Sequence, residues 1–278
     1  MKDEVKHPNG QRIPNGMLED NYPRNMWWVA AYSEEVTTKP ITRWLLETPV
    51  VLYRSEDGTP AALYDRCPHR WAPLSEGHVA DDKIVCPYHG MEFNSGGHCT
   101  KAPTQTMMPK TAQIPSYPVR EAGAFIWIWM GDPDAANPDD IFTIENYDNS
   151  SWGRTAGGSM DIACHYLYVV DNLLDPSHVA WVHVSSFAGA GTGNLPLDIE
   201  KLDDGVIVSR WVMDAAPPPY YAPILPFSGN CDRKQHYECR LPSTAINMSI
   251  YTRAGTGGDD ANLPDDAFIN ISYNFMTP

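Results

Sequence analysis

The sequence lacks a concentration of basic residues. Its 278 residues include 20 Lys and Arg against 35 Asp and Glu, which gives a formal net charge of −15, and nowhere do Lys and Arg cluster. Proteins that bind nucleic acid or anionic membranes usually carry a basic patch. We therefore expect this chain to bind neither nucleic acid nor a membrane.

Long apolar runs are also missing. No run approaches the roughly 20 residues that a membrane-spanning helix needs, and the first residues, MKDEVKHPNGQRIP, lack the apolar region of a signal peptide. We therefore expect a cytoplasmic protein. In that reducing compartment the six cysteines are expected to be thiols, which favours ligand or catalytic roles over disulfides.

What the sequence does contain is enough apolar material for a sizeable core, at 42% hydrophobic residues with 9 Trp and 14 Tyr. Residues 1–20 are polar and predict a flexible arm. Short β-forming segments separated by turn residues follow, at 49–54, 61–66, 83–88 and 124–131. The sequence DPDAANPDD (132–140) interrupts this pattern, so we predict one domain over residues 21–147 and a second over 148–278.

The second half mixes helix with strand. A helix is predicted over about 170–184, and β-forming runs at 205–214, 245–252 and 267–276 predict strands. In the last run apolar residues alternate with polar or small ones, as in a strand with one solvated face.

A first metal signature lies in the first half. Cys67 and His69, then Cys86 and His89, form the pattern C-x-H, sixteen residues, C-x-x-H. Each half supplies one thiolate and one imidazole, whereas zinc fingers more often pair Cys with Cys and His with His. The pattern suits two irons with different ligands, as in a Rieske [2Fe–2S] centre, where two imidazoles replace two thiolates on one iron. A Cys2His2 zinc site is the alternative.

These residues carry a resemblance to a known family. The sequences CPHRWAPLSEGHV and CPYHGMEFNSGGHC resemble the Rieske domain of Rieske non-haem iron oxygenases. The segments PRNMWWVAAYSEEV, FIWIWMGDP and VVDNLLDPSHVAWVH resemble the vanillate O-demethylase group of oxygenase components. The resemblance implies an α+β fold, with a mostly antiparallel-β Rieske domain followed by a helix-grip (lipid-transfer-like) catalytic domain.

A second candidate site is the pair His178 and His183. Alone, it could be a polar pair on an ordinary helix. The resemblance implies that both bind a mononuclear Fe(II) in a 2-His-1-carboxylate triad, which leaves positions open for O2 and substrate. Residues five apart on an ideal helix point about 140° from each other, so we predict that the helix bends, ends or bulges there.

Asp175 has two interpretations. As part of an Asp-Pro pair it suits the start of a helix. The resemblance instead implies a bridge, in which its carboxylate accepts a hydrogen bond from His178 and another from His89 of a neighbouring subunit. A carboxylate behind a metal-bound imidazole fixes the tautomer of that imidazole. The resemblance also implies a role near the iron for Asn172, and a head-to-tail homotrimer.

The third iron ligand is missing from the pattern. The resemblance places this Asp in a helix beyond Pro278, so we expect a catalytic domain truncated at its C-terminus, and an activity that belongs to the full-length protein. Nine aspartates of the second half lie outside that context: Asp198, Asp203, Asp204, Asp214, Asp232, Asp259, Asp260, Asp265 and Asp266.

The function that the resemblance implies is a terminal oxygenase component. A reductase or ferredoxin partner supplies electrons from NAD(P)H, and O2 is used to monooxygenate or O-demethylate a small, methoxybenzoate-like aromatic compound. Candidate pocket residues lie in APILPFSGNCDRK (222–234), where Asn230 is a candidate for binding a polar substituent and Arg233 for pairing with an acid.

Other functions fit the same residues. N-dealkylation, methyl hydroxylation and ring cis-dihydroxylation use the same kind of iron centre, and product analysis separates them. A Rieske electron carrier without oxygenase activity is the third class, and the His178/His183 pair argues against it.

Overall fold

The computed structural model describes residues 22–278 except 104, 106, 108–111, 184 and 188–191, so the predicted arm over residues 1–20 lies outside the described residues. The chain forms two compact units. Unit 1 contains the residues up to Ala163 together with Thr277 and Pro278, and unit 2 runs from Cys164 to Met276.

The division between the units lies later than the predicted boundary between residues 147 and 148. The hydroxyl of Tyr32 donates to the carbonyl of Gly158 at 3.1 Å, so the segment after residue 148 still packs on unit 1. The last two residues belong to unit 1 as well, since Thr277 Oγ1 donates to the carbonyl of Val29 at 2.7 Å.

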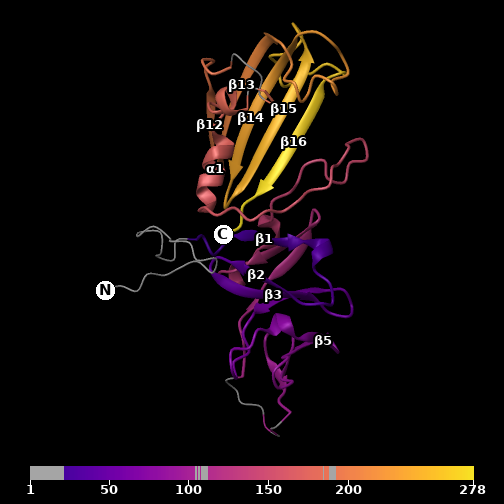
Figure 1. Ribbon diagram of the computed structural model, residues 1–278, viewed down its shortest axis with the longest axis vertical. Helices are drawn as coiled ribbons and strands as arrows, with labels where there is room; N and C mark the ends of the chain where they lie inside the picture. The colour runs from indigo at the N-terminus through magenta and orange to yellow at the C-terminus, as the bar shows by residue number, and fades with distance from the viewer. Residues whose placement is uncertain (1–21, 104, 106, 108–111, 184, 188–191) are drawn as a thin grey trace, which may run out of the picture. The chain divides into compact units, whose positions relative to one another are not determined.

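Unit 1 is built from three antiparallel sheets (Figure 1). The first has the order β1 (Trp27–Tyr32), β11 (Phe125–Trp129) and β10 (Val119–Ala122). The second has the order β2 (Ile41–Leu45), β3 (Thr48–Arg54), β4 (Pro60–Tyr64) and β9 (Ser116–Tyr117). The third has the order β5 (His78–Ala80), β6 (Lys83–Val85), β7 (Glu92–Phe93) and β8 (Cys99–Lys101). Short 3-10 helices lie at Ser33–Glu35, Leu74–Glu76, Pro133–Ala135 and Pro138–Asp140.

The core of unit 1 follows from the apolar runs of the sequence. Strand β11 is buried on both faces from Ile126 to Trp129, as the uninterrupted run FIWIWM predicts. A cluster of fully buried side chains, among them Val51, Leu63 and Phe93, packs around Cys67 and Cys86. Both cysteines are therefore part of the apolar core.

Unit 2 is a single antiparallel meander in which consecutive strands pair in chain order. Its strands are β12 (Asp198–Leu202), β13 (Gly205–Ala215), β14 (Cys231–Arg240), β15 (Thr244–Arg253) and β16 (Phe268–Phe275). Helix α1 (Tyr166–Leu174) lies against β14 and β15 (Figure 1). The predicted α+β fold with mostly antiparallel sheets is thus confirmed.

Unit 2 differs from the sequence prediction in its helix and in two strands, because β12 was not predicted and neither was β14. The helix expected over about 170–184 begins earlier, at Tyr166, and stops at Leu174, and a separate short helix α2 follows at Val179–Val182. Strand β14 was not predicted, because its sequence CDRKQHYECR is mostly polar.

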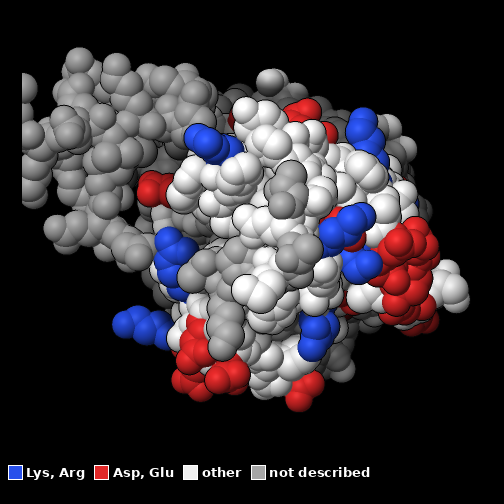
Figure 2. All heavy atoms as spheres, turned by 90° about the horizontal axis from the view of Figure 1, so that it is seen from below, with Lys and Arg blue, Asp and Glu red and all other residues white. Residues whose placement is uncertain are grey.

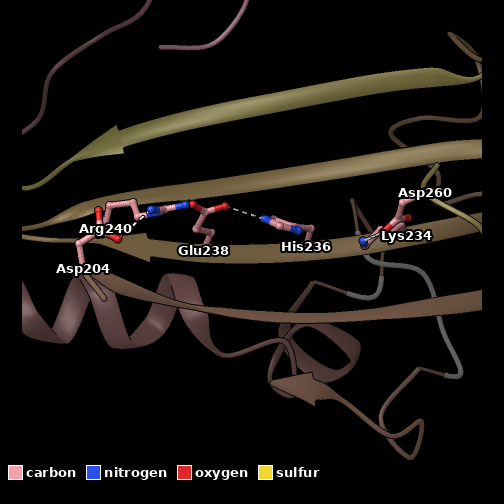
Figure 3. A network of polar contacts seen from close by, with 6 residues as sticks. All are labelled: Asp204, Lys234, His236, Glu238, Arg240 and Asp260. Atoms are coloured by element: carbon pink, nitrogen blue, oxygen red, sulfur yellow. Dashed lines mark hydrogen bonds and ion pairs between the residues drawn. The ribbon is translucent and has the colours of Figure 1, made fainter. Parts of the chain in front are cut away.

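The polar residues of β14 are explained by their pairing across one face of the sheet. Lys234 pairs with Asp260, and His236 lies 2.8 Å from Glu238. Glu238 also pairs with Arg240, whose Nη1 lies 2.8 Å from Oδ1 of Asp204. Figure 3 shows this network running along the strand. Charged pairs thus take the place of the apolar residues that strand prediction looks for.

Among the residues that the structure describes, no helix combines the length and the apolar character needed to cross a membrane. On the face shown in Figure 2, Lys and Arg side chains are separated by uncharged surface, whereas Asp and Glu gather in groups.

Asp232 holds the loop that follows β15. Its side chain is fully buried. Oδ1 accepts from the backbone N–H of Asp214 at 2.8 Å, and Oδ2 accepts from Gly255, Thr256 and Gly257 at 2.7, 3.0 and 2.9 Å. Burial alone would raise the pKa of this carboxyl, but the four N–H donors outweigh it and keep the pKa below its usual value.

We predict that Asp232→Asn lowers the free energy of unfolding at pH 7 by about 2–4 kcal/mol, because buried N–H groups lose a charged acceptor. A carboxyl with a lowered pKa stabilises the fold above its unfolded pKa, and this contribution is lost as the pH falls through the folded pKa. The difference from wild type in urea unfolding should therefore shrink in acid. Asp266→Asn, at the exposed pair with Arg253, is the control and should cost less than about 1 kcal/mol. Equal losses in the two variants would contradict the prediction.

Candidate metal centres

The four residues of the first metal signature lie together in unit 1. Cys67 and Cys86 are 1% and 2% exposed, whereas His69 and His89 are exposed. The imidazole rings of the two histidines are 4.7 Å apart between centroids. The site therefore has two buried sulfurs on its inner side and two imidazoles at the surface.

The two loops have the same backbone structure. In each, the cysteine N–H donates to the carbonyl five residues on, at 2.9 Å for Cys67 and 2.8 Å for Cys86. The N–H four residues on donates back to the cysteine carbonyl, at 2.8 and 3.0 Å. The residue at that position, Trp71 or Gly90, has a positive φ of 59° or 70°. The two similar sequences thus form the same loop. The positive φ strains the backbone at Trp71 but not at Gly90.

Further contacts fix the first loop. Asp65, 1% exposed, accepts from the N–H and the hydroxyl of Ser75 at 2.8 and 2.7 Å. Burial raises the pKa of the Cys67 thiol to about 11, with the neighbouring Cys86 adding to the shift and backbone N–H groups of His69 and Arg70 opposing it. Buried sulfur donors whose charge nothing else compensates are suited to a metal or cluster.

The second candidate site is in unit 2, where the helix breaks. Helix α1 ends at Asp175, which has the extended φ/ψ of −90°/99°. His178 immediately precedes α2, and His183 ends it with a φ/ψ of −113°/17°. The predicted distortion between the two histidines is confirmed: an interrupted helix places one at each end of a single short turn.

The two imidazoles face one another. Their ring centroids are 5.3 Å apart, with an interplanar angle of 71°. Two imidazoles that bind one ion at metal–nitrogen distances of about 2 Å have centroids about 4.5–6 Å apart, since each centroid lies about 1 Å behind its nitrogen. The pair therefore fits a shared metal ion.

Asp175 lies behind the first of these histidines. Its Oδ2 is 3.5 Å from Nδ1 of His178, which is buried and has no well-formed hydrogen bond within the described part of the chain. Oδ1 accepts from the N–H of Ser177 at 2.7 Å. Burial acts to raise the pKa of Asp175, but Ser177 and His178 together lower it. Asp175 does not cap α2, because that position is held by His178.

Within the described residues, no three His, Cys, Asp or Glu side chains are arranged to hold one metal ion. Several aspartates of unit 2 are engaged elsewhere: Asp204, Asp232, Asp259, Asp260 and Asp266.

The side chains of two other predicted site residues, Asn172 and Asn230, are not part of these contacts. Asn172 is exposed on α1, and its carbonyl accepts from the N–H of Asp175 at 3.3 Å. Asn230 is exposed, and its amide donates to the carbonyl and Oδ1 of Asp214 at 3.2 and 2.9 Å. The Asn230 amide is therefore committed to a turn.

Sequence reasoning missed the residues that hold the histidine segment on the sheet. Nη2 of Arg210, on β13, donates to the carbonyl of Pro176 at 3.3 Å. The amide of Asn247, on β15, donates to the carbonyl of Leu173 at 3.0 Å. Only the alternation of side chains along the strands points to them, since neither residue belongs to a motif.

Comparison with known proteins gives these sites a family. Residues 26–118 match the Rieske [2Fe-2S] domain, and residues 162–278 match the vanillate O-demethylase oxygenase C-terminal domain. The chain is 36% identical to a putative toluene-4-sulfonate monooxygenase system iron-sulfur subunit of Comamonas testosteroni, over 92% of the chain and 74% of that protein. It is also 36% identical to a vanillate O-demethylase oxygenase subunit of a Pseudomonas species, over 92% and 73%.

Solved structures of dicamba monooxygenase share the fold. One, bound to 3,6-dichlorosalicylic acid, has a TM-score of 0.84 and 33% identity, over 92% of this chain and 74% of that one. Another, with non-heme iron and dicamba, has a TM-score of 0.76 and 31% identity, over 92% and 72%. The chain therefore belongs to the Rieske non-haem iron oxygenase components, in the group of the vanillate O-demethylase oxygenases.

Proposed function

We propose that this chain is the terminal oxygenase component of an enzyme system that removes the methyl group from a small methoxylated aromatic compound. The observation that carries the proposal is the presence of two separate donor sets. A two-Cys, two-His set lies in unit 1, and a pair of facing imidazoles lies at a helix break in unit 2.

The ligands follow from the donor sets. Cys67 and Cys86 hold one iron of a [2Fe–2S] cluster, and His69 and His89 hold the other. His178 and His183 hold a mononuclear iron, with a carboxylate as the third ligand. When bound, the cluster supplies one-electron transfer and the mononuclear iron supplies reaction with O2.

Asp175 orients His178. Its carboxylate lies beside Nδ1, so it would fix the tautomer in which Nε2 is the nitrogen free to bind a metal. We extend this to a head-to-tail homotrimer, in which Asp175 of one subunit also accepts a hydrogen bond from His89 of the next. The exposure of His89 and the partial exposure of Asp175 support this contact. Head-to-tail interfaces of this kind can close into a ring. Asn172, on the last turn of α1, places a polar side chain near the proposed iron site.

The reaction is oxidative O-demethylation. A reductase or ferredoxin delivers two electrons from NAD(P)H. One oxygen atom of O2 enters a methyl C–H bond, and the other takes up these electrons and two protons and leaves as water. The hemiacetal formed then collapses to a phenol and formaldehyde. The vanillate and dicamba O-demethylase relatives support this reaction type. We place the system in the cytoplasm, as the sequence predicts.

The Rieske assignment is tested by Cys67→Ser in protein purified without oxygen. Wild type should carry about two acid-labile sulfides per chain, and the variant should lose most of them because a buried ligand is removed. Cys99→Ser changes a partly buried thiol outside the motif and should leave the sulfide content unchanged. Zinc without sulfide in wild type would contradict the assignment.

The mononuclear site is tested by His183→Ala after loading with Fe(II). Loss of a ligand should reduce formaldehyde release from 4-methoxybenzoate by at least about 100-fold, beyond the effect of losing an outer partner, while the sulfide content remains that of wild type. Formaldehyde is measured in a single turnover of chemically reduced protein with O2. The exposed His78, changed to Ala, is the control.

Two results would contradict the proposal. Equal formaldehyde from wild type and His183→Ala would remove this histidine from the site. A hydroxylated ring product without formaldehyde would favour ring dihydroxylation over demethylation.

The bridging role is tested by Asp175→Asn. The variant should keep both iron sites and the trimer, but cluster re-oxidation by O2 with substrate present should slow by about 10–100-fold, the usual effect of losing a partner behind a metal-bound histidine. The decay is followed by the visible absorbance of the cluster, and the mass in solution by light scattering. Ser177→Ala is the matched control, because its backbone N–H still donates to Asp175. A monomeric wild type would exclude the bridge.

A further inference from the structure

Arg233 is an unpaired charge in the interior of unit 2. Its side chain is 2% exposed, and Nε and Nη1 have no hydrogen-bond partner among the residues that the structure describes. Burying a guanidinium without an acceptor is costly. Such a group calls for an acceptor from outside the chain, such as a water, an ion or a ligand.

The carboxylates beside Arg233 in the sequence are on the other face of the strand. Successive side chains of a strand point to opposite faces. Asp232 and Lys234 therefore point away from Arg233, and Figure 3 shows Lys234 within the paired network of that opposite face. Both oxygens of Asp232 are taken by backbone N–H groups.

The face that carries Arg233 is the one that contacts the histidine segment. Gln235, two residues on, accepts from Nε of Arg210 at 2.7 Å, and Nη2 of the same guanidinium donates to the carbonyl of Pro176, two residues before His178. Gln235 and Arg210 form the row of side chains that touches this segment. Arg233 lies in the next row, about 7 Å away along the strand. Two buried guanidinium groups share this face in a chain with a net charge of −15.

Arg210 differs from Arg233 because neutral oxygens satisfy it. Besides Gln235 and Pro176, it donates to the carbonyl of Thr192 at 2.6 Å. None of these acceptors carries a charge, so the positive charge of the face is left without a counter-ion among the described contacts.

Aromatic rings border Arg233. Tyr251 is directly opposite it on β15, and Phe268 is opposite Tyr251 on β16. Tyr221 packs on Tyr251 with ring centroids 4.7 Å apart. Burial raises the pKa of both tyrosines, so their phenols are neutral near pH 7 and supply no anion. Aromatic rings therefore lie beside Arg233 on the neighbouring strands.

We propose that Arg233 binds the anionic substituent of the aromatic substrate, with the rings of Tyr221 and Tyr251 beside the substrate ring. The proposal deepens the function given above, and rests on it for the identity of the site. A carboxylate or a sulfonate supplies the same chemistry, since each presents an anionic oxygen that can accept a charge-assisted hydrogen bond from the guanidinium.

The test is calorimetric titration of the Fe(II)-loaded protein without oxygen. The probes are 4-methoxybenzoate, 4-methoxybenzenesulfonate and the neutral 4-methoxybenzamide. Arg233→Gln should weaken binding of the preferred anion by about 10- to 100-fold, as for loss of a charge-assisted hydrogen bond, and change binding of the amide by less than about twofold. Arg233→Lys should restore part of the lost affinity, because it keeps the charge but not the planar set of N–H donors.

Lys234→Gln is the matched control, because it removes a cation from the neighbouring position on the other face. It should leave all three affinities unchanged. Thermal unfolding completes the test, because Arg233→Gln should not lower Tm when an unpaired charge is removed.

Two results would overturn the proposal. One is an equal loss of affinity for all three probes, together with a lower Tm, which would make Arg233 a structural residue. The other is tighter binding of the amide than of both anions by wild type. If wild type then releases formaldehyde from neutral methoxyarenes, the demethylase function is kept and the anion site is rejected. Arg233-dependent binding of anions without any formaldehyde would instead keep the anion site and reject the demethylase.

Discussion

His178 and His183 face one another although they are five residues apart, and a continuous α-helix cannot bring such a pair together. The chain achieves this by ending α1 at Asp175 and starting a single short turn at His178. The break frees backbone carbonyls, and the sheet supplies donors to them: Asn247 to Leu173, and Arg210 to Pro176. The need for a broken helix therefore determines which polar side chains the sheet must carry on the facing side.

In the Rieske loops, backbone hydrogen bonds position the cysteines and histidines. Each loop closes on its cysteine by the same two hydrogen bonds, so the sulfurs are held in the core while the imidazoles are left at the surface. A positive φ is required four residues after each cysteine, and only Gly90 adopts it without strain. That Trp71 adopts it as well indicates that the hydrogen bonds of the loop outweigh a cost of about 1–2 kcal/mol.

Local chemistry decided what the sequence could predict. The C-x-H and C-x-x-H spacings, the histidine pair and the need for a helix break are properties of short segments, and the structure brings each set together. Strand β14 and the end of unit 1 are not determined by short segments. In β14, charge pairs with Asp204 and Asp260 replace the apolar alternation, and the segment after residue 148 stays with unit 1 through contacts such as that of Gly158 with Tyr32. Partners distant in sequence determine both, and no local pattern encodes them.

The alternation of β14 also separates two kinds of arginine. Arg240 pairs with Glu238 and Asp204 on one face, where the charges compensate one another near solvent and add little stability. On the other face Arg210 is satisfied by neutral oxygens, and Arg233 keeps two donors without an acceptor in the described part of the unit. Structural arginines in this sheet thus have their acceptors in the chain itself. An arginine that lacks them, beside aromatic rings and one row from the histidine segment, is placed to bind something that arrives from outside.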